Sequence, residues 1–289
     1  MKIYIWGHKL HEHTHSYIHA SYYKTFEYLG HEVYWIDSRD DLSQYDFSNS
    51  VFFTENFVKG GMPLRKDCKY ITHHIDTKYL TDAGVPYKNV LKLGNYLPSL
   101  EIHEKVDHLA YWDQSTRTLY QTWGTDLLPH EIDEDNPAKF SHNNKSLNYI
   151  GMLYEQGPWW AQSFADILWE KKRVEFKVFT QNASFKENLE MIRSSYLCPD
   201  FRSDWHLQCG YIPCRIFKNI SYGRVTGTNS PFVKRAFGDY VAYGGTPDTL
   251  FSNLLEADAG GDIDIREAML FVKENHTFIN RVNTILKFL

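Results

Sequence analysis

The sequence has no long hydrophobic run, few cysteines and no concentrated stretch of basic residues. No apolar run approaches the roughly 18 residues that a membrane-spanning helix needs, so we expect no membrane span. Four cysteines in 289 residues do not make a secreted disulfide framework, and MKIYIWGHK lacks the apolar core of a secretory signal. These absences favour a cytoplasmic protein. The formal charge of −5, with scattered Lys and Arg, argues against nucleic acid as the partner.

The chain is long and rich in apolar residues. At 289 residues it is long enough for two domains of ordinary size. Because 43% of its residues are hydrophobic, it can bury substantial cores, which excludes a disordered chain. Aromatic residues make up 16%, and their flat amphipathic rings suit sugar faces as well as protein cores.

The first half predicts alternating strands and helices. KIYIWG predicts a buried strand closed by Gly7, and apolar side chains over 18–29 recur at helical spacing. HEVYWID then predicts a second strand, and short apolar runs predict further strands at 50–54, 69–73 and 108–112. A strand, a helix and a strand joined by short connections indicate a right-handed βαβ unit and a parallel sheet.

A polar stretch at 131–145 suggests a domain boundary, after which the strand–helix pattern restarts with LNYIG. We predict an α/β fold of two Rossmann-like domains facing a cleft. Residues 1–135 form the first domain, 136–265 the second, and 266–289 a closing helix that packs back on a domain. Open α/β sheets bind ligands beyond the carboxyl ends of their strands, so strand-end residues are the first candidates for a site.

Three segments of the second half resemble the donor-binding half of GT-B glycosyltransferases: NYIGMLYEQGP, YLCPDFRSDWHLQCGYIPCRIFKNISYG and VTGTNSP. WGTDLLPHEI resembles the end of the acceptor-binding half of such enzymes, and the rest of the first half resembles it in layout. The chain is most similar to small exostosin-like or fucosyltransferase-like enzymes of bacteria and of large DNA viruses such as chloroviruses. It departs from the retaining families that carry two glutamates seven residues apart in the equivalent helix.

The resemblance implies a glycosyltransferase that moves a sugar from a nucleotide-diphosphate sugar to a carbohydrate hydroxyl. It implies a UDP-linked donor, with xylose as one candidate sugar, and a viral glycan-decorating enzyme. It further implies a reaction with no cofactor and no metal. An inverting reaction is favoured, and the sequence leaves a retaining one open. The expected partners are therefore the nucleotide-sugar donor and a carbohydrate acceptor.

Arg215 and Lys218 are the leading candidates for binding the donor phosphates. They lie three residues apart near the start of a predicted helix, so their side chains share a face where backbone amides also attract anions. The alternative is a pair of surface cations. Short polar side chains after the next strand suit sugar hydroxyls or phosphate oxygens, although they also suit an ordinary capped turn. The further donor candidates are Thr228, Asn229, Ser230, Thr180 and Tyr196.

Histidines crowd the loop HKLHEHTHSYIH, which holds His8, His11, His13, His15 and His19. An imidazole accepts a hydroxyl proton near neutral pH, and a carboxylate beside it can orient it. His15 is the leading base because it directly precedes the first predicted helix, and THHID adds the second and third choices. We assign catalysis to His15, Asp76 and His73, and acceptor binding to His13, His74 and Asp113.

Two other functions stay open at this point. Alternating His11, His13 and His15 could bind a metal in a hydrolase, with ligands from the later histidines, or the chain could be a non-catalytic sugar-binding module. Against the hydrolase, these histidines lie in a predicted loop, and the PCRIFK helix has no role in it. We predict no metal ligands; metal analysis and a transfer assay separate the three functions.

Overall fold

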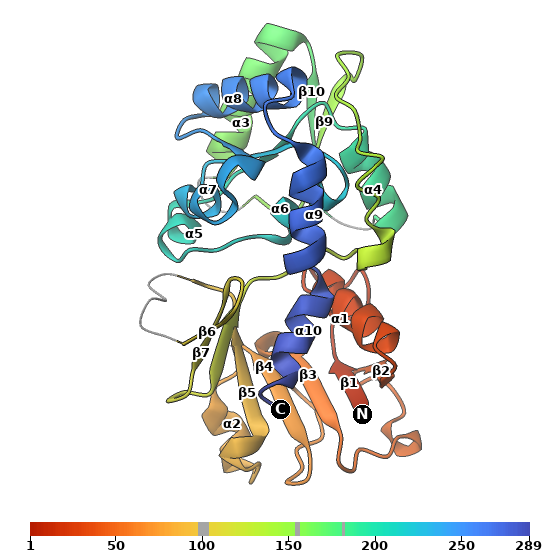
Figure 1. The fold of residues 1–289 in the computed structure, drawn as a ribbon. Helices are drawn as coiled ribbons and strands as arrows, with labels where there is room; N and C mark the ends of the chain where they lie inside the picture. The colour runs from red at the N-terminus through yellow and green to blue at the C-terminus, as the bar shows by residue number, and fades with distance from the viewer. Residues whose placement is uncertain (98–103, 154–156, 181–182) are drawn as a thin grey trace. The chain divides into compact units, whose positions relative to one another are not determined.

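The computed structural model describes residues 1–97, 104–153, 157–180 and 183–289. It divides into two compact units, the first made of Met1–Thr122 with Phe278–Leu289 and the second of Trp123–Thr277. The chain therefore enters its second unit before residue 135, and its return to the first begins at Phe278 instead of 266. Both chain ends belong to the first unit (Figure 1). No helix in the described ranges has the length and apolar character to cross a bilayer.

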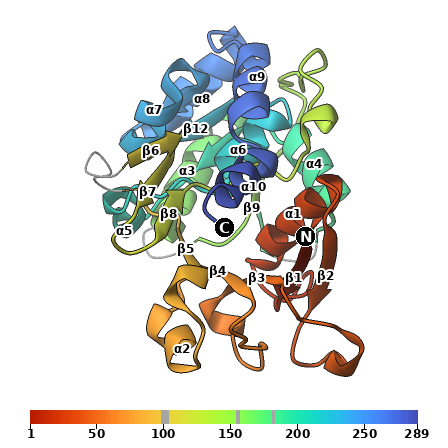
Figure 2. The ribbon, with the colours of Figure 1, turned by 60° about the horizontal axis from the view of Figure 1, so that its bottom comes forward.

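The first unit is built on one sheet of order β2-β1-β3-β4-β5-β8-β7-β6 (Figure 2). Strands β1 to β5 and β8 pair in parallel, whereas β7 runs antiparallel to both β8 and β6. The strands are β1 Lys2–Trp6, β2 Glu32–Ile36, β3 Val51–Glu55, β4 Lys69–His73, β5 Val90–Gly94, β6 Glu104–Asp107, β7 Ala110–Asp113 and β8 Thr118–Gln121.

Helices α1 (Ser16–Tyr28) and α10 (Phe278–Leu286) contact each other over one face of this sheet. The ring of Tyr22 on α1 lies 4.2 Å from that of Phe53 and 4.9 Å from that of Phe278. Alternate residues of the strands point to the other face, where an aromatic cluster buries α2 (Thr77–Asp82) through Leu80. Short 3-10 turns occupy Leu42–Gln44, Asn56–Val58 and Tyr87–Asn89.

The second unit has two parallel sheets, β10-β9 and β11-β12-β13. They meet where the N–H of Tyr196 donates to the carbonyl of Ser146 at 2.8 Å. Its strands are β9 Ser146–Ile150, β10 Glu175–Phe179, β11 Cys198–Asp200, β12 Thr226–Thr228 and β13 Val241–Tyr243. Its helices are α3 Gly157–Lys172, α4 Phe185–Arg193, α5 Asp204–Gln208, α6 Cys214–Ser221, α7 Pro231–Phe237, α8 Pro247–Gly260 and α9 Ile265–Asn275, with 3-10 turns at Pro129–Glu131 and Gly238–Tyr240.

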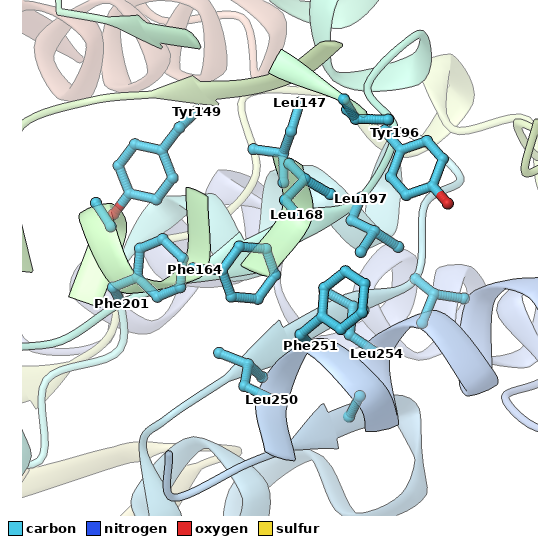
Figure 3. Packing of buried hydrophobic residues seen from close by; sticks show 14 of the residues in the cluster. Leu147, Tyr149, Phe164, Leu168, Tyr196, Leu197, Phe201, Leu250, Phe251 and Leu254 are labelled. Carbon is cyan, nitrogen blue, oxygen red and sulfur yellow. The ribbon is translucent and has the colours of Figure 1, made fainter. Parts of the chain in front are cut away.

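The core of the second unit packs α3 and α8 against the strands (Figure 3). The ring of Phe201 is stacked 5.4 Å from that of Tyr149 and lies tilted 5.3 Å from that of Phe164. A capping box begins α4: the Ser184 side chain accepts from the N–H of Glu187, and the Glu187 side chain accepts from the N–H of Ser184. The predicted α/β class is confirmed, since each unit layers helices on parallel strands.

Candidate functional site

The carboxyl ends of β1, β3 and β4 lie side by side in the first sheet, because these strands are neighbours in its order. From β1 the chain crosses to β2 on one side and then to β3 on the other side. The gap between β1 and β3 is therefore a topological switch point, where open α/β sheets bind their ligands. The loop after β1, residues 7–15, and the last residue of β3 meet there.

Glu55 lies at the centre of this switch point. It ends β3 with only 2% of its surface exposed, and its carboxylate contacts Nε2 of His8 and Nδ1 of His15. Nδ1 of His73, at the end of β4, lies 4.0 Å from the same carboxylate. Burial alone would raise the pKa of Glu55, but the interactions with His15, His73 and His8 hold it well below its usual range. Glu55 is therefore ionised at neutral pH.

The loop that brings the histidines together is tightly constrained. Gly7 has φ +82°, and a Cβ there would come within 2.5 Å of the Val58 side chain. His8 and His11 also have positive φ, +45° and +71°, which is uncommon for residues other than glycine and typical of strained functional loops. Nδ1 of His19 on α1 donates to the Gly7 carbonyl at 2.9 Å, and burial lowers the pKa of His19 to about 4. A neutral, buried imidazole thus anchors the start of the loop.

The structure brings three of the predicted residues together: His15, His13 and His73. The ring centroid of His15 lies 5.3 Å from that of His13 and 5.6 Å from that of His73. His15 is the N-cap of α1 and keeps 26% of its side chain exposed, so a substrate can reach it. A carboxylate bonded to Nδ1 fixes the tautomer in which Nε2 accepts a proton, as a general base must.

His74 and Asp76 follow His73 but face different surroundings. The exposed His74, with φ +56°, packs its ring 3.9 Å from that of His73. Asp76 is exposed too, and its carboxylate caps α2 by accepting from the N–H of Lys78 at 2.9 Å. The carboxylate that contacts His15 is thus Glu55, whereas Asp76, the second choice for the base, caps α2.

Asp113 lies at the other edge of the sheet, which corrects its placement in the acceptor site. It ends β7, and β7 runs antiparallel to the strands that carry the histidines, so its carboxyl end points the opposite way. Its carboxylate accepts from Ser115 and Thr116 in the turn to β8. Those hydrogen bonds lower the pKa of Asp113 to about 2. Asp113 therefore organises a turn.

A second polar cluster lies at the carboxyl ends of β9 and β11 in the second unit. Here again the chain crosses from β9 to β10 on one side and to β11 on the other, which makes a second switch point. The Oδ1 atom of Asp200, on a fully buried residue, accepts from Arg202 at 2.6 Å and from Arg215 at 2.8 Å. Two cations around one carboxylate leave the cluster with a net positive charge, and α3 begins close by in the chain, at Gly157. A helix start and a positive cluster both favour an anion.

Arg215 is fixed by hydrogen bonds and by a contact with an aromatic ring. Its guanidinium donates to the hydroxyl of Tyr149 at 2.6 Å and to the carbonyl of Ile150, and its central carbon lies 3.8 Å from the centre of the Tyr149 ring. Gly151, with φ +124°, leaves room for it, because a Cβ there would overlap the guanidinium. Lys218 on the same helix forms a 2.8 Å ion pair with the buried Asp126. Both cations are thus bound to acids, in contrast to the surface cations considered above.

Three of the remaining donor candidates form hydrogen bonds that stabilise the local structure. Ser230 caps α7 by accepting from the N–H of Val233, Thr228 accepts from the N–H of Ser230, and Asn229 makes two hydrogen bonds to the backbone of Arg202. Thr180 is exposed just after β10. Tyr196 precedes β11, so it lies at the amino end of that strand, buried in the core beside Phe140. That position corrects its assignment to the nucleotide, because the switch point is at the other end of the strand. Residues 154–156 of NYIGMLYEQGP lie outside the described residues.

Sequence reasoning missed Glu55, Asp200 and Arg202. Each stands at or just after the carboxyl end of a buried strand, which is a usable signal: an acid or a cation directly following an apolar run. Among the described residues, Oδ2 of Asp200 and Nε of Arg202 are buried atoms with no hydrogen-bond partner. Such atoms are costly in a folded protein and mark places where a ligand can bind.

Comparison with known proteins identifies the fold. No protein-family model and no curated protein sequence matches the chain. Among solved structures, an alpha-glucosyltransferase in complex with UDP and DNA is similar with a TM-score of 0.61 and 9% identity, over 99% of both chains. AviGT4, a glycosyltransferase of avilamycin A biosynthesis, is similar with a TM-score of 0.54 and 12% identity over 99% of this chain and 96% of its own.

A UDP-forming α,α-trehalose-phosphate synthase from Burkholderia xenovorans, with glucose-6-phosphate bound, is similar with a TM-score of 0.50 and 11% identity. This match covers 78% of the chain and 73% of the synthase. At such identities the likeness concerns the fold, and two of the three matches extend over nearly the whole chain. The chain has the α/β fold of GT-B glycosyltransferases.

Proposed function

We propose that this protein is a glycosyltransferase that moves a sugar from a UDP-linked donor to a hydroxyl of a carbohydrate acceptor. The observation that carries the proposal is the likeness in fold to glycosyltransferases, which extends over nearly the whole chain for two of the three structures named above. One of the three is in complex with UDP, and another is described as UDP-forming. The two polar clusters support it, because each occupies a switch point of its own unit, where such folds bind ligands.

The first unit supplies the base. Nδ1 of His15 donates to the ionised Glu55, and Nε2 of His15 accepts the proton of the acceptor hydroxyl as its oxygen bonds to the anomeric carbon. The bond from that carbon to the diphosphate breaks at the same time, and the nucleotide leaves with the electron pair. Glu55 stabilises the imidazolium that forms. A single displacement of this kind inverts the anomeric configuration.

The second unit supplies the donor site. The cluster of Asp200, Arg202 and Arg215 holds a net positive charge next to the end of β9, which suits a diphosphate. Arg215 is already bound to Tyr149 and Asp200, so its role is to position the cluster as well as to provide charge. With two fixed guanidinium groups at this place, we propose that the leaving group needs no metal ion.

The acceptor we propose is a glycan. One of the similar structures contains DNA, but this chain has a formal charge of −5, which is unfavourable for phosphate-rich partners. UDP release from a panel of UDP-sugars, including UDP-xylose and UDP-glucose, tests the proposal with added glycan acceptors and a chelator. Release that depends on a glycan supports it. If no UDP-sugar is consumed with any acceptor or by water, the proposed function is wrong.

A further inference from the structure

Four side chains of the first unit could together bind a metal ion. One ligand atom each from His8, His13, His15 and Glu55 lies within 4.8 Å of the other three. The set combines three imidazoles with one carboxylate, the ligand types that Zn²⁺ and neighbouring transition metals favour. Its members come from two adjacent strand ends, so the sheet itself brings them together.

We propose that His8, His13, His15 and Glu55 form a binding site for one divalent transition metal ion of the Zn²⁺ class, and that the bound ion inhibits transfer. The inhibition rests on the proposed function, because an ion bound to the ring of His15 and the carboxylate of Glu55 would break the contact between them on which the base depends. The binding itself does not depend on that function.

The geometry requires only small movements. In a tetrahedral zinc site, ligand atoms about 2.0–2.1 Å from the ion lie about 3.3 Å from one another. The most distant pair in the group would therefore close by about 1.5 Å. Glu55 and His8 are buried and fixed, whereas His13 is exposed on the loop and can adjust. The rings of His8 and His13 already stack with their centroids 4.3 Å apart.

Binding would exchange existing contacts for metal bonds. The carboxylate of Glu55 now pairs with His8 and His15, and Nδ1 of His13 accepts an exposed hydrogen bond from the N–H of His15 at 3.2 Å. A divalent ion replaces these with four bonds and balances the buried negative charge of Glu55. The rings of His19 and His73 lie next to those of His8 and His15, respectively. His19 also donates to the Gly7 carbonyl, which fixes the start of the loop.

The same loop offers a matched control. His11 is exposed like His13 but lies outside the group, and its Nδ1 contacts the Tyr17 hydroxyl at 3.1 Å. Asparagine is the replacement of choice, because it tolerates the positive φ of His11 and of His8. The variants are therefore His13→Asn and His8→Asn as tests and His11→Asn as the control.

The first experiment measures binding on full-length protein without a histidine tag, stripped of metal by a chelator. Co²⁺ is titrated and followed by its visible absorption, and Zn²⁺ is titrated by calorimetry. We expect one equivalent of metal, an absorption typical of four-coordinate Co²⁺, and an affinity at least tenfold lower in His13→Asn and His8→Asn but unchanged in His11→Asn. Thermal unfolding of each metal-free variant identifies any that fails to fold. Absence of saturable binding, or an equal loss in His11→Asn, would overturn the site.

The second experiment measures transfer at increasing free Zn²⁺. We expect reversible inhibition of at least tenfold, full recovery with a chelator, and a need for at least tenfold more Zn²⁺ in His13→Asn relative to its own metal-free rate. Activity that requires the metal would overturn the inhibitory role while leaving the site intact. If no transfer is found under any condition, the proposed function fails, but the binding titration still decides whether the site exists.

Discussion

Replacing Glu55 by glutamine separates the role proposed for it from a merely structural one. Glutamine has nearly the same shape, so it fills the buried position, but it carries no charge and has one oxygen where the carboxylate has two. Glu55 pairs with His8 and His15 through both of its oxygens. The variant can keep one of these contacts as an acceptor, and it loses the charge that stabilises the imidazolium of His15.

The expected effect on the rate follows from that loss. General-base catalysis contributes about 10²–10⁴ in rate, or roughly 3–5 kcal/mol of the barrier. We expect turnover of Glu55→Gln to fall within this range, while UDP affinity stays the same, since the residues proposed to bind UDP belong to the second unit. Weakening charge-assisted hydrogen bonds costs about 1–3 kcal/mol, partly offset because a neutral group is easier to bury. A modest fall in the melting temperature is therefore expected.

The assay pairs initial rates with calorimetric titration of UDP on the same preparations. The control is Glu12→Gln, since Glu12 is an exposed acid of the same loop that pairs with Arg39 on the surface. We expect the control to retain its rate and stability. If Glu55→Gln turned over like the parent enzyme, His15 would not depend on a carboxylate and the assignment of the base would be wrong. A parallel loss of UDP binding would instead show general damage to the fold.

Four further outcomes are expected. Arg215→Ala should lower the free energy of unfolding by roughly 2–4 kcal/mol, since it breaks a buried pair while Arg202 still holds Asp200, and should weaken UDP binding at least tenfold; unchanged melting and affinity would remove it from the donor site. His19 has a pKa of about 4 when folded, below its ordinary value of about 6.5, so its contribution to stability is present above pH 6.5 and is lost as the pH falls toward 4. Between pH 7.5 and 5 the parent should lose about 2 kcal/mol more than His19→Gln in chemical denaturation, and equal losses would contradict the shift. Tyr196→Phe should bind UDP normally, because its ring lies in the core at the amino end of β11. Asp113→Asn should keep its turnover, because Asp113 lies at the edge of its sheet opposite the histidines, and a hundredfold loss would return it to the acceptor site.

The local patterns of the sequence predicted β1 to β4, α1 and part of the site. The helix from Ser16 follows from side-chain spacing alone, and His15 was identified by its place before that helix. The spacing of residues along the chain does not determine the direction or the order of the strands in a sheet. Asp113 and Tyr196 were assigned to strand ends at which a ligand binds, and both lie at the opposite edge. Asp113 does so because β7 runs antiparallel to β8, and Tyr196 because β11 begins after it, at Cys198.

Glu55 illustrates a second limit of sequence reasoning. All five residues of β3 are buried. In the sequence, an acid at the end of such a strand resembles a polar residue that only marks where the strand ends. Its importance arises from residues 40 or more positions away in the chain order, since His15 precedes it by 40 and His8 by 47. Contacts of that separation depend on the parallel pairing of β1 with β3. The donor cluster of Asp200 and Arg215 depends in the same way on the packing of α6 beside β11.

The measurement that tests the central claim most directly is a calorimetric titration of the intact protein with UDP in the presence of a chelator. We predict saturable binding of one UDP per chain without any divalent metal. Arg202→Leu, which removes one of the two cations beside Asp200, should weaken that binding at least tenfold. Failure to bind UDP at all, or binding only with added Mg²⁺ or Mn²⁺, would contradict a metal-independent transferase that uses a UDP-linked donor.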